Sequence, residues 1–183
     1  MRAYTWKEAF ADALEAAELG SPPYQTFVGY CYDMGRGVRQ DVKLAAYWYE
    51  RAAQNGSTEG MFNLALMCET GQGMRRQATR ATALFERAAK QGHLQAQTNL
   101  AVRYLEGRGV ERDLAEGIRW LRRAARRGDD KAQYNLGRAY LGGEGVRKNE
   151  SHAKTWLSKA AKGGHFRARR LLKSMQSKAK SNS

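Results

Sequence analysis

A short glycine motif recurs along the chain at a constant spacing of 36 residues. Its copies begin at Gly35, Gly71, Gly107 and Gly143, and each reads Gly-x-Gly followed by Val or Met. The same 36-residue period relates Gly20, Gly56, Gly92, Gly128 and Gly164, and the alanine pairs that begin at Ala16, Ala52, Ala88, Ala124 and Ala160. A fixed period of this length is typical of a repeat array, in which each unit completes its core against its neighbours.

Each repeat predicts two helices. The first helices are expected near 22–34, 58–70, 94–106 and 130–142, and the second helices near 42–55, 78–91, 114–127 and 150–163. Residues such as Ser57, Asp41 and Asp129 precede these segments and are good N-caps. The periodic glycines follow the segments, where a helix end needs a left-handed residue.

The same register extends beyond the four repeats. Thr5 and Glu8 have capping-box spacing and predict a second-type helix over 5–18. Residues 165–177 predict a first-type helix that caps the other end, and 178–183 a flexible basic tail. We therefore expect one all-α solenoid over 1–177, with full repeats at 20–55, 56–91, 92–127 and 128–163 and a half repeat at each end.

These residues resemble Sel1-like repeats, which are relatives of tetratricopeptide repeats. The resemblance is carried in the last repeat by Ala132, Leu136, Gly137, Tyr140, Gly143, Gly145 and Val146, and in the first by Asp41, Ala45, Trp48, Tyr49, Ala52, Ala53 and Gly56. It implies a right-handed α/α superhelical solenoid and an adaptor that holds partners on a concave face. Some bacterial relatives are immunity proteins against secreted toxins, which is an alternative function.

Net charge, hydropathy and cysteine content limit the expected partners and cellular compartment. The 183 residues carry a net charge of +14, and residues 61–183 hold 26 of the 32 Lys and Arg but only 10 of the 18 Asp and Glu. Such a balance favours acidic partners or nucleic acid. No apolar stretch is long enough for a membrane span, residues 1–20 do not read as a secretory signal, and two cysteines cannot form a disulfide framework. We expect a cytoplasmic protein.

Candidate chemistry is sparse, so we expect no enzyme, cofactor or metal site. His93, His152 and His165 lack partners at metal-ligand spacing and are read as loop and cap residues. Cys31 and Cys68 are not paired with a histidine by spacing. The glycine motifs lack the Gly-Lys-Ser/Thr of a phosphate loop and are read as repeat turns.

The first helices are the expected binding face. Their variable and hydrogen-bonding positions are Phe27, Tyr30, Asn63, Met67, Asn99, Arg103, Asn135 and Arg138. Asn can donate and accept hydrogen bonds to a peptide backbone, although it could equally be a structural residue of the repeat. These positions run from aromatic to cationic and predict a peptide with an apolar head and an acidic tail.

An arginine cluster on one second helix is the other candidate. It consists of Arg119, Arg122, Arg123, Arg126 and Arg127, and spacings of three and four place most of it on one face. It could be a solvated face, dock an acidic protein, or contact phosphates of nucleic acid without reading sequence. The preferred function is a non-enzymatic scaffold for an acidic protein or peptide, with an immunity protein or nonspecific nucleic-acid binding as alternatives.

Overall fold

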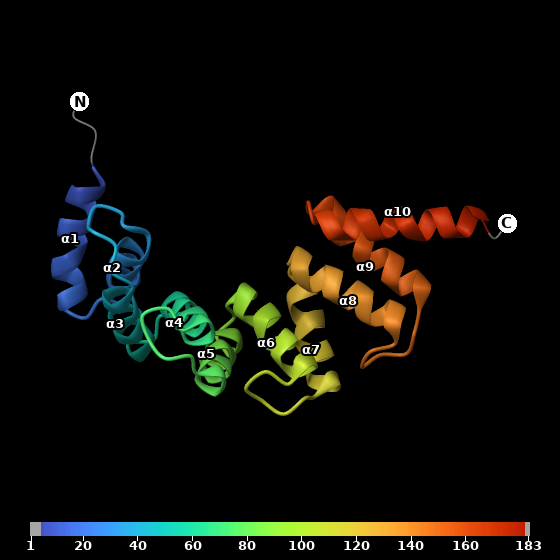
Figure 1. Ribbon diagram of the computed structural model, residues 1–183, viewed down its shortest axis with the longest axis horizontal. Coiled ribbons are helices and arrows are strands. Elements are labelled where there is room, and N and C mark those ends of the chain that lie inside the picture. The colour runs from blue at the N-terminus through green and yellow to red at the C-terminus, as the bar shows by residue number, and fades with distance from the viewer. Residues whose placement is uncertain (1–4, 182–183) are drawn as a thin grey trace. The chain divides into compact units, whose positions relative to one another are not determined.

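The computed structural model describes residues 5–181, and in that part of the chain it contains ten α-helices and no strand (Figure 1). The helices are α1 (Trp6–Glu18), α2 (Pro22–Met34), α3 (Val42–Gln54), α4 (Thr58–Thr70), α5 (Ala78–Lys90), α6 (Leu94–Glu106), α7 (Leu114–Arg126), α8 (Asp130–Gly142), α9 (Glu150–Lys162) and α10 (Phe166–Ser181). The all-α prediction is confirmed.

The helices form two compact units. Unit 1 holds α1 to α5 and ends at His93, and unit 2 begins at Leu94 and holds α6 to α10. Within each unit every helix packs against the next one along the chain (Figure 1). First helices are α2 and α4 in unit 1 and α6, α8 and α10 in unit 2, and the others are second helices.

The glycine positions predicted the helix ends closely. In the four full repeats, the first helices have the predicted bounds and the second helices end one residue earlier than expected. The largest difference is α10, which continues to Ser181 and so takes in most of the segment expected as a tail. That tail carries no periodic glycine, and its Lys, Ala and Ser residues do not stop a helix.

Caps explain why the helices begin where they do. Thr5 and Glu8 form the expected reciprocal capping box at α1, and Ser57 accepts a hydrogen bond from the backbone N–H of Gly60. Ser21 precedes α2 but makes no side-chain cap bond. Pro22 at the first helical position already removes one N–H that would need a partner.

The two glycines of the repeated motif serve different needs. Gly35 ends α2 in the left-handed region, with φ of 67°, which glycine adopts without steric cost. Gly37 also has positive φ, and a Cβ there would overlap the Trp6 carbonyl. Gly73 stands in the same relation to Val42 of the preceding second helix. The motif therefore turns the chain and lets consecutive repeats approach closely.

Each unit has its own apolar core. In unit 1 the fully buried side chains include Tyr49, Leu64 and Phe85, and in unit 2 they include Leu100, Leu121, Leu136 and Leu157. The three inner alanine pairs are buried beside them, and of the two end pairs Ala17 and Ala160 are buried; these small side chains let the helices approach closely. Burying each large side chain contributes roughly 1.5–3 kcal/mol, so this periodic core holds the exposed helix faces in place.

Candidate functional site

The predicted residues of α2 lie in an aromatic patch at the start of unit 1. Phe27 stacks on Trp6 of α1 with ring centroids 6.2 Å apart, and Tyr30 lies 6.4 Å from the same ring. Trp6 is 46% exposed and Tyr30 38%. Trp6 was missed from the sequence because α1 was treated only as a capping helix. We call Trp6, Phe27 and Tyr30 the N-terminal aromatic patch.

Two predicted contact residues lie in the interior instead. Met67 and Arg103 are each 3% exposed, and one Arg103 guanidinium nitrogen donates to the Arg108 carbonyl at 3.3 Å. The other two residues at this repeat position, Cys31 and Ala139, are also buried. The varied side chains at this position suggested a surface, but the position faces the core, so Met67 and Arg103 are left out of the proposed binding surface.

The three predicted asparagines differ in their surroundings. All three are half-buried on their first helices. Asn99 Nδ2 donates to the Gln95 carbonyl one turn earlier at 2.9 Å, which supports the structural alternative at that position. Asn135 lines pockets on both sides of α8. Asn135 is therefore the asparagine best placed to meet a partner, and Asn63 remains a prediction.

Arg138 and Asn135 border a groove between α8 and α10. The groove comprises two adjoining pockets of about 640 and 430 Å³ that share Tyr134, Phe166 and Arg167. Together they are lined by Lys131, Tyr134, Asn135, Arg138, His165, Phe166, Arg167, Arg170, Leu171 and Ser174, which we call the α8–α10 groove. It brings two of the predicted residues together with eight others.

The α8–α10 groove combines cations with aromatic surface. Among its described lining residues, four are Lys or Arg and none is Asp or Glu. The Arg138 guanidinium lies 6.0 Å from the centroid of the Tyr134 ring. The His165 ring stacks on the same Tyr134 ring, with centroids 4.4 Å apart. Phe166 is 69% exposed. An apolar side chain and a carboxylate could both be accommodated here.

The groove could have been found by extending the repeat register. Leu171 lies one period after Asn135, and Ser174 one period after Arg138. Both line the α8–α10 groove. Residues 165–177 were instead treated as a cap, so Phe166 and its neighbouring arginines were not included in the predicted binding face.

A third pocket adjoins the groove on the other side of α8. It has a volume of about 510 Å³ between α6 and α8, and Asn135 and Arg138 line it too. Glu106, Arg112 and Glu144 also contribute, so its charges are mixed. The cationic character of the first-helix face in unit 2 is thus concentrated between α8 and α10.

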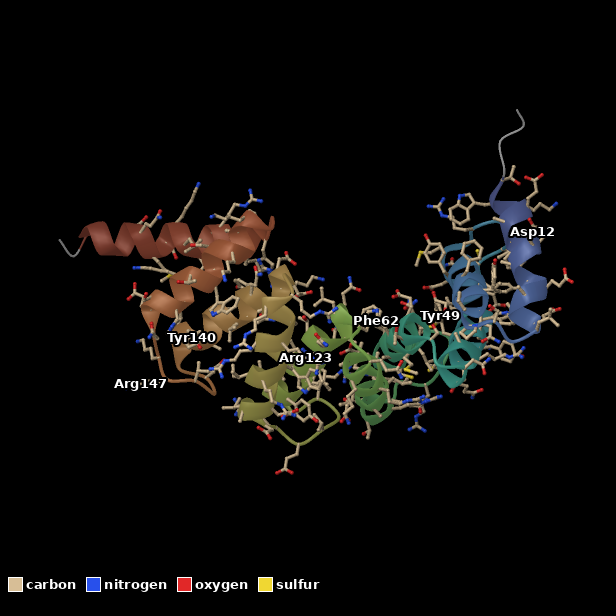
Figure 2. All side chains as sticks on the ribbon, turned by 180° about the vertical axis from the view of Figure 1, so that it is seen from behind. Asp12, Tyr49, Phe62, Arg123, Tyr140 and Arg147 are labelled. Atoms are coloured by element: carbon tan, nitrogen blue, oxygen red, sulfur yellow. The ribbon has the colours of Figure 1, made fainter. Side chains whose placement is uncertain are left out.

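The predicted arginine cluster lies on the solvent side of α7. The opposite side of that helix buries Ile118, Trp120 and Leu121. Side chains of the cluster make local contacts. Arg119 pairs with Glu116 at 2.6 Å, and Arg123, which is labelled in Figure 2, has its guanidinium 5.4 Å from the centroid of the Trp120 ring. Arg122 donates to the Tyr140 hydroxyl and Arg127 to Gln97. All five arginines are exposed, as expected for a surface cluster.

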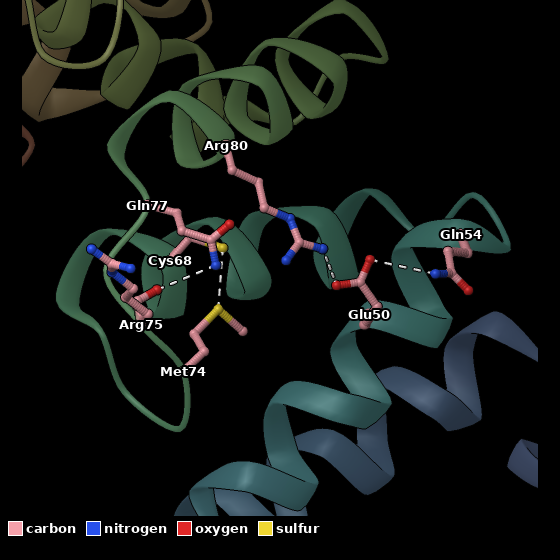
Figure 3. Close-up of polar contacts among 7 residues, drawn as sticks. All are labelled: Glu50, Gln54, Cys68, Met74, Arg75, Gln77 and Arg80. Atoms are coloured by element: carbon pink, nitrogen blue, oxygen red, sulfur yellow. Dashed lines mark hydrogen bonds and ion pairs between the residues drawn. The ribbon is translucent and has the colours of Figure 1, made fainter.

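Histidines and cysteines have structural surroundings. His93 stacks on Phe62 and bonds to Glu59, while the Cys68 thiol donates to the Met74 sulfur at 3.3 Å (Figure 3). Burial raises the pKa of the Cys31 and Cys68 thiols, which makes them poor nucleophiles at neutral pH. Within residues 5–181 no group of three His, Cys, Asp or Glu residues could hold a metal ion.

A comparison with models of protein families shows which family the chain belongs to. The Sel1 repeat model matches residues 22–57, 58–93, 94–129 and 130–165, which is most of the chain. The chain belongs to the Sel1 repeat family. Sel1 repeat proteins are generally scaffolds for protein interactions, and the family is generally non-catalytic. None of the helices described here is long and apolar enough to cross a membrane.

Solved structures of two relatives are similar over 93% of this chain. The protective antigen c5321 of uropathogenic Escherichia coli is 36% identical with a TM-score of 0.89, and a Sel1 repeat protein of Oxalobacter formigenes is 33% identical with a TM-score of 0.83. This chain covers 36% and 49% of those two chains. These matches confirm the Sel1-repeat solenoid.

Two further matches are more limited. The immunity protein Pa5087 of Pseudomonas aeruginosa is 21% identical over 91% of this chain and 62% of its own, with a TM-score of 0.60, which shows a shared fold. The chitin synthase regulator SKT5 of Saccharomyces cerevisiae is 46% identical over 48 residues, 26% of this chain and 7% of that protein. This chain therefore spans only a small part of that regulator.

Proposed function

We propose that the chain is a non-enzymatic scaffold that binds an acidic protein or peptide on the first-helix face of unit 2. The α8–α10 groove is the observation that carries this proposal. Its four cations attract carboxylates, and its aromatic rings offer apolar contact to the same partner. Asn135 and Arg138 supply the predicted part of the site, and Phe166 and Arg167 the added part.

The N-terminal aromatic patch lies at the aromatic end of the predicted binding face, where we expected the apolar head of a peptide. Trp6 and Tyr30 are partly exposed, and the Arg36 guanidinium lies 5.6 Å from the Trp6 ring. Exposed aromatic side chains beside an arginine are common in protein interfaces. We propose this patch as a separate contact surface of unit 1. The free cysteines favour a reducing compartment, which supports binding in the cytoplasm.

The experiment is affinity capture from native lysate at moderate salt after nuclease treatment, with mass spectrometry. The wild-type chain is compared with Arg138→Ala/Arg167→Ala, which removes two exposed cations from the groove. Lys162→Ala/Lys173→Ala is the control, because it removes the same charge at exposed positions outside the groove. We expect one stoichiometric acidic protein with the wild type and the control, reduced about tenfold with the groove variant.

Other outcomes would contradict this proposal. Capture that disappears with nuclease, or falls equally with both double variants, indicates phosphate contact or a general charge effect. If the captured protein is a toxin whose toxicity is lost on co-expression with this chain, the scaffold is an immunity protein. That alternative has support from the fold alone, through Pa5087.

A further inference from the structure

A second cationic pocket of unit 2 involves the second helices α7 and α9 and shares no lining residue with the α8–α10 groove. It has a volume of about 480 Å³ and is lined by Arg122, Tyr140, Gly145, Val146, Arg147, Lys148, Asn149 and His152. These residues come from α7, α8, the loop after α8 and α9. We call this the α7–α9 pocket, and Figure 2 shows Tyr140 and Arg147 beside the loop.

Unit 1 holds the same positions two repeats earlier. Glu50 corresponds to Arg122, and Arg80 to His152, because each pair is separated by 72 residues. In unit 1 the Arg80 guanidinium pairs with the Glu50 carboxylate, and Gln54 donates to the other Glu50 oxygen (Figure 3). A carboxylate from the second helix thus fills this site within the chain itself.

Unit 2 lacks that internal carboxylate. Among the described lining residues of the α7–α9 pocket, Arg122, Arg147 and Lys148 are cations and none is Asp or Glu. Two acids flank the lining residues along the chain. Glu144 lines the pocket between α6 and α8 instead, and Glu150 pairs with Lys154 at 2.9 Å. The place where unit 1 has an ion pair therefore has several positive side chains in unit 2.

The pocket is also ordered by its own contacts. Arg122 donates to the Tyr140 hydroxyl at 3.3 Å, and the His152 ring lies 5.2 Å from the Tyr140 ring. The Asn149 side chain caps α9 through the His152 backbone N–H. These contacts orient Arg122 and His152 toward a common space, so an incoming anion meets side chains that are already positioned.

We propose that the α7–α9 pocket binds a carboxylate side chain of an acidic segment in a protein partner, which takes the role that Glu50 has in unit 1. The ligand class follows from the unit 1 pair, since the same two positions there hold a carboxylate against a guanidinium. The inference rests on the proposed function in that it needs a protein partner, but it concerns a surface separate from the α8–α10 groove.

The test uses the full chain and a synthetic acidic peptide as probe. The peptide alternates Glu and Ser, with blocked ends, and a Gln-for-Glu version is its control. The chain has only three histidines, so NMR of their imidazole signals reports each region separately: His152 for this pocket, His165 for the groove and His93 for unit 1. We expect the His152 signal to shift with the acidic peptide and not with the Gln peptide.

Variants then test the carboxylate role. Arg122→Glu/His152→Arg recreates the Glu50–Arg80 pair within unit 2, so the chain should fold normally. The ring signals of Tyr140, which also lines the pocket, replace His152 as the reporter in this variant and should respond to the peptide about tenfold more weakly. Arg147→Gln, which keeps His152 as a reporter, should also weaken the response. Lys173→Glu, an exposed charge reversal outside the pocket, is the matched control and should leave the response within twofold.

Three results would overturn the inference. One is a His152 signal that does not move at saturating peptide, even if His165 responds, which would leave the groove proposal standing. Another is equal loss of binding with Lys173→Glu and Arg147→Gln. The third is a single-stranded oligonucleotide of matched charge that shifts His152 at lower concentration than the peptide, because the pocket would then be a phosphate site.

Discussion

Units 1 and 2 share one repeat plan but differ sharply in charge. Residues 1–93 contain 11 Lys and Arg against 10 Asp and Glu, whereas residues 94–183 contain 21 against 8. Both units bury the same repeat positions, for example Leu64 and Leu136. Most of the difference lies at exposed positions, where the repeat imposes no requirement, although Arg103 is buried. It underlies the separate binding role that we propose for unit 2.

The same contrast appears at single positions. Glu50 and Arg80 neutralise each other in unit 1, while their counterparts Arg122 and His152 leave positive charge at the surface of unit 2. Exposed aromatic side chains occur in both units, at Trp6 and at Phe166. Unit 1 thus offers an aromatic surface with balanced charge, and unit 2 an aromatic surface among cations.

Substitutions in the two cores should have the largest effect on the free energy of unfolding, and they test whether the cores are equivalent. Leu64→Ala and Leu136→Ala remove fully buried side chains at one repeat position, and each should lower the free energy of unfolding by about 2–5 kcal/mol. Urea denaturation measures the cost, and amide hydrogen exchange locates it. A cost below about 1 kcal/mol for either variant would contradict the equivalence.

Labelling of the cysteines reports on unit 1 alone, because both thiols lie in that unit. Burial raises the pKa of Cys31 and Cys68, so less thiolate forms at a given pH and access is blocked. We expect labelling by a thiol reagent at pH 8 to be about a hundredfold slower in the native chain than in urea. Raising the pH toward the thiol pKa should speed it. Rapid native labelling would show that unit 1 opens readily.

Partner binding should distinguish the two aromatic surfaces. Arg167→Ala/Arg170→Ala alters the α8–α10 groove and should weaken the captured acidic partner about tenfold. Trp6→Ala/Tyr30→Ala alters the N-terminal aromatic patch and should have a smaller effect. Isothermal titration with the purified partner measures both. A larger loss of affinity with Trp6→Ala/Tyr30→Ala than with Arg167→Ala/Arg170→Ala would show that the main contact lies in unit 1.

The smallest expected effect compares two serines that precede first helices in unit 1. Ser57→Ala removes a cap bond to Gly60 and should cost about 1 kcal/mol. Ser21 makes no side-chain cap bond, so Ser21→Ala should cost much less. Thermal denaturation of the two variants gives the difference, and equal losses would show that the cap bond does not stabilise α4.

The sequence was sufficient for the helices because glycine and capping residues act locally. The ends of α2, α4, α6 and α8 follow from Gly35 and its periodic equivalents. No periodic residue marks the end of α10, and the predicted end of this helix was wrong by four residues. Helix ends without a local stop depend on packing and solvent, which the repeat pattern does not encode.

The binding surface was less predictable than the fold. Arg138 and Asn135 line a pocket between α6 and α8, whereas Met67 and Arg103 are buried. Variation at a repeat position suggests exposure, yet buried positions also vary when neighbouring repeats adjust to fill the space. Phe166 was missed because it lines a groove between α8 and α10, and no single repeat contains both of these helices.

The most direct test of a protein-binding unit 2 is site-specific photocrosslinking in native lysate. A photoreactive phenylalanine analogue is placed at Phe166 in the groove or, for comparison, at Tyr30 in the aromatic patch; both positions are exposed. We expect a discrete crosslink from position 166 to one acidic protein, and its loss in Arg138→Ala/Arg167→Ala. A crosslink from position 30 alone, or a crosslink from 166 to nucleic acid, would contradict it.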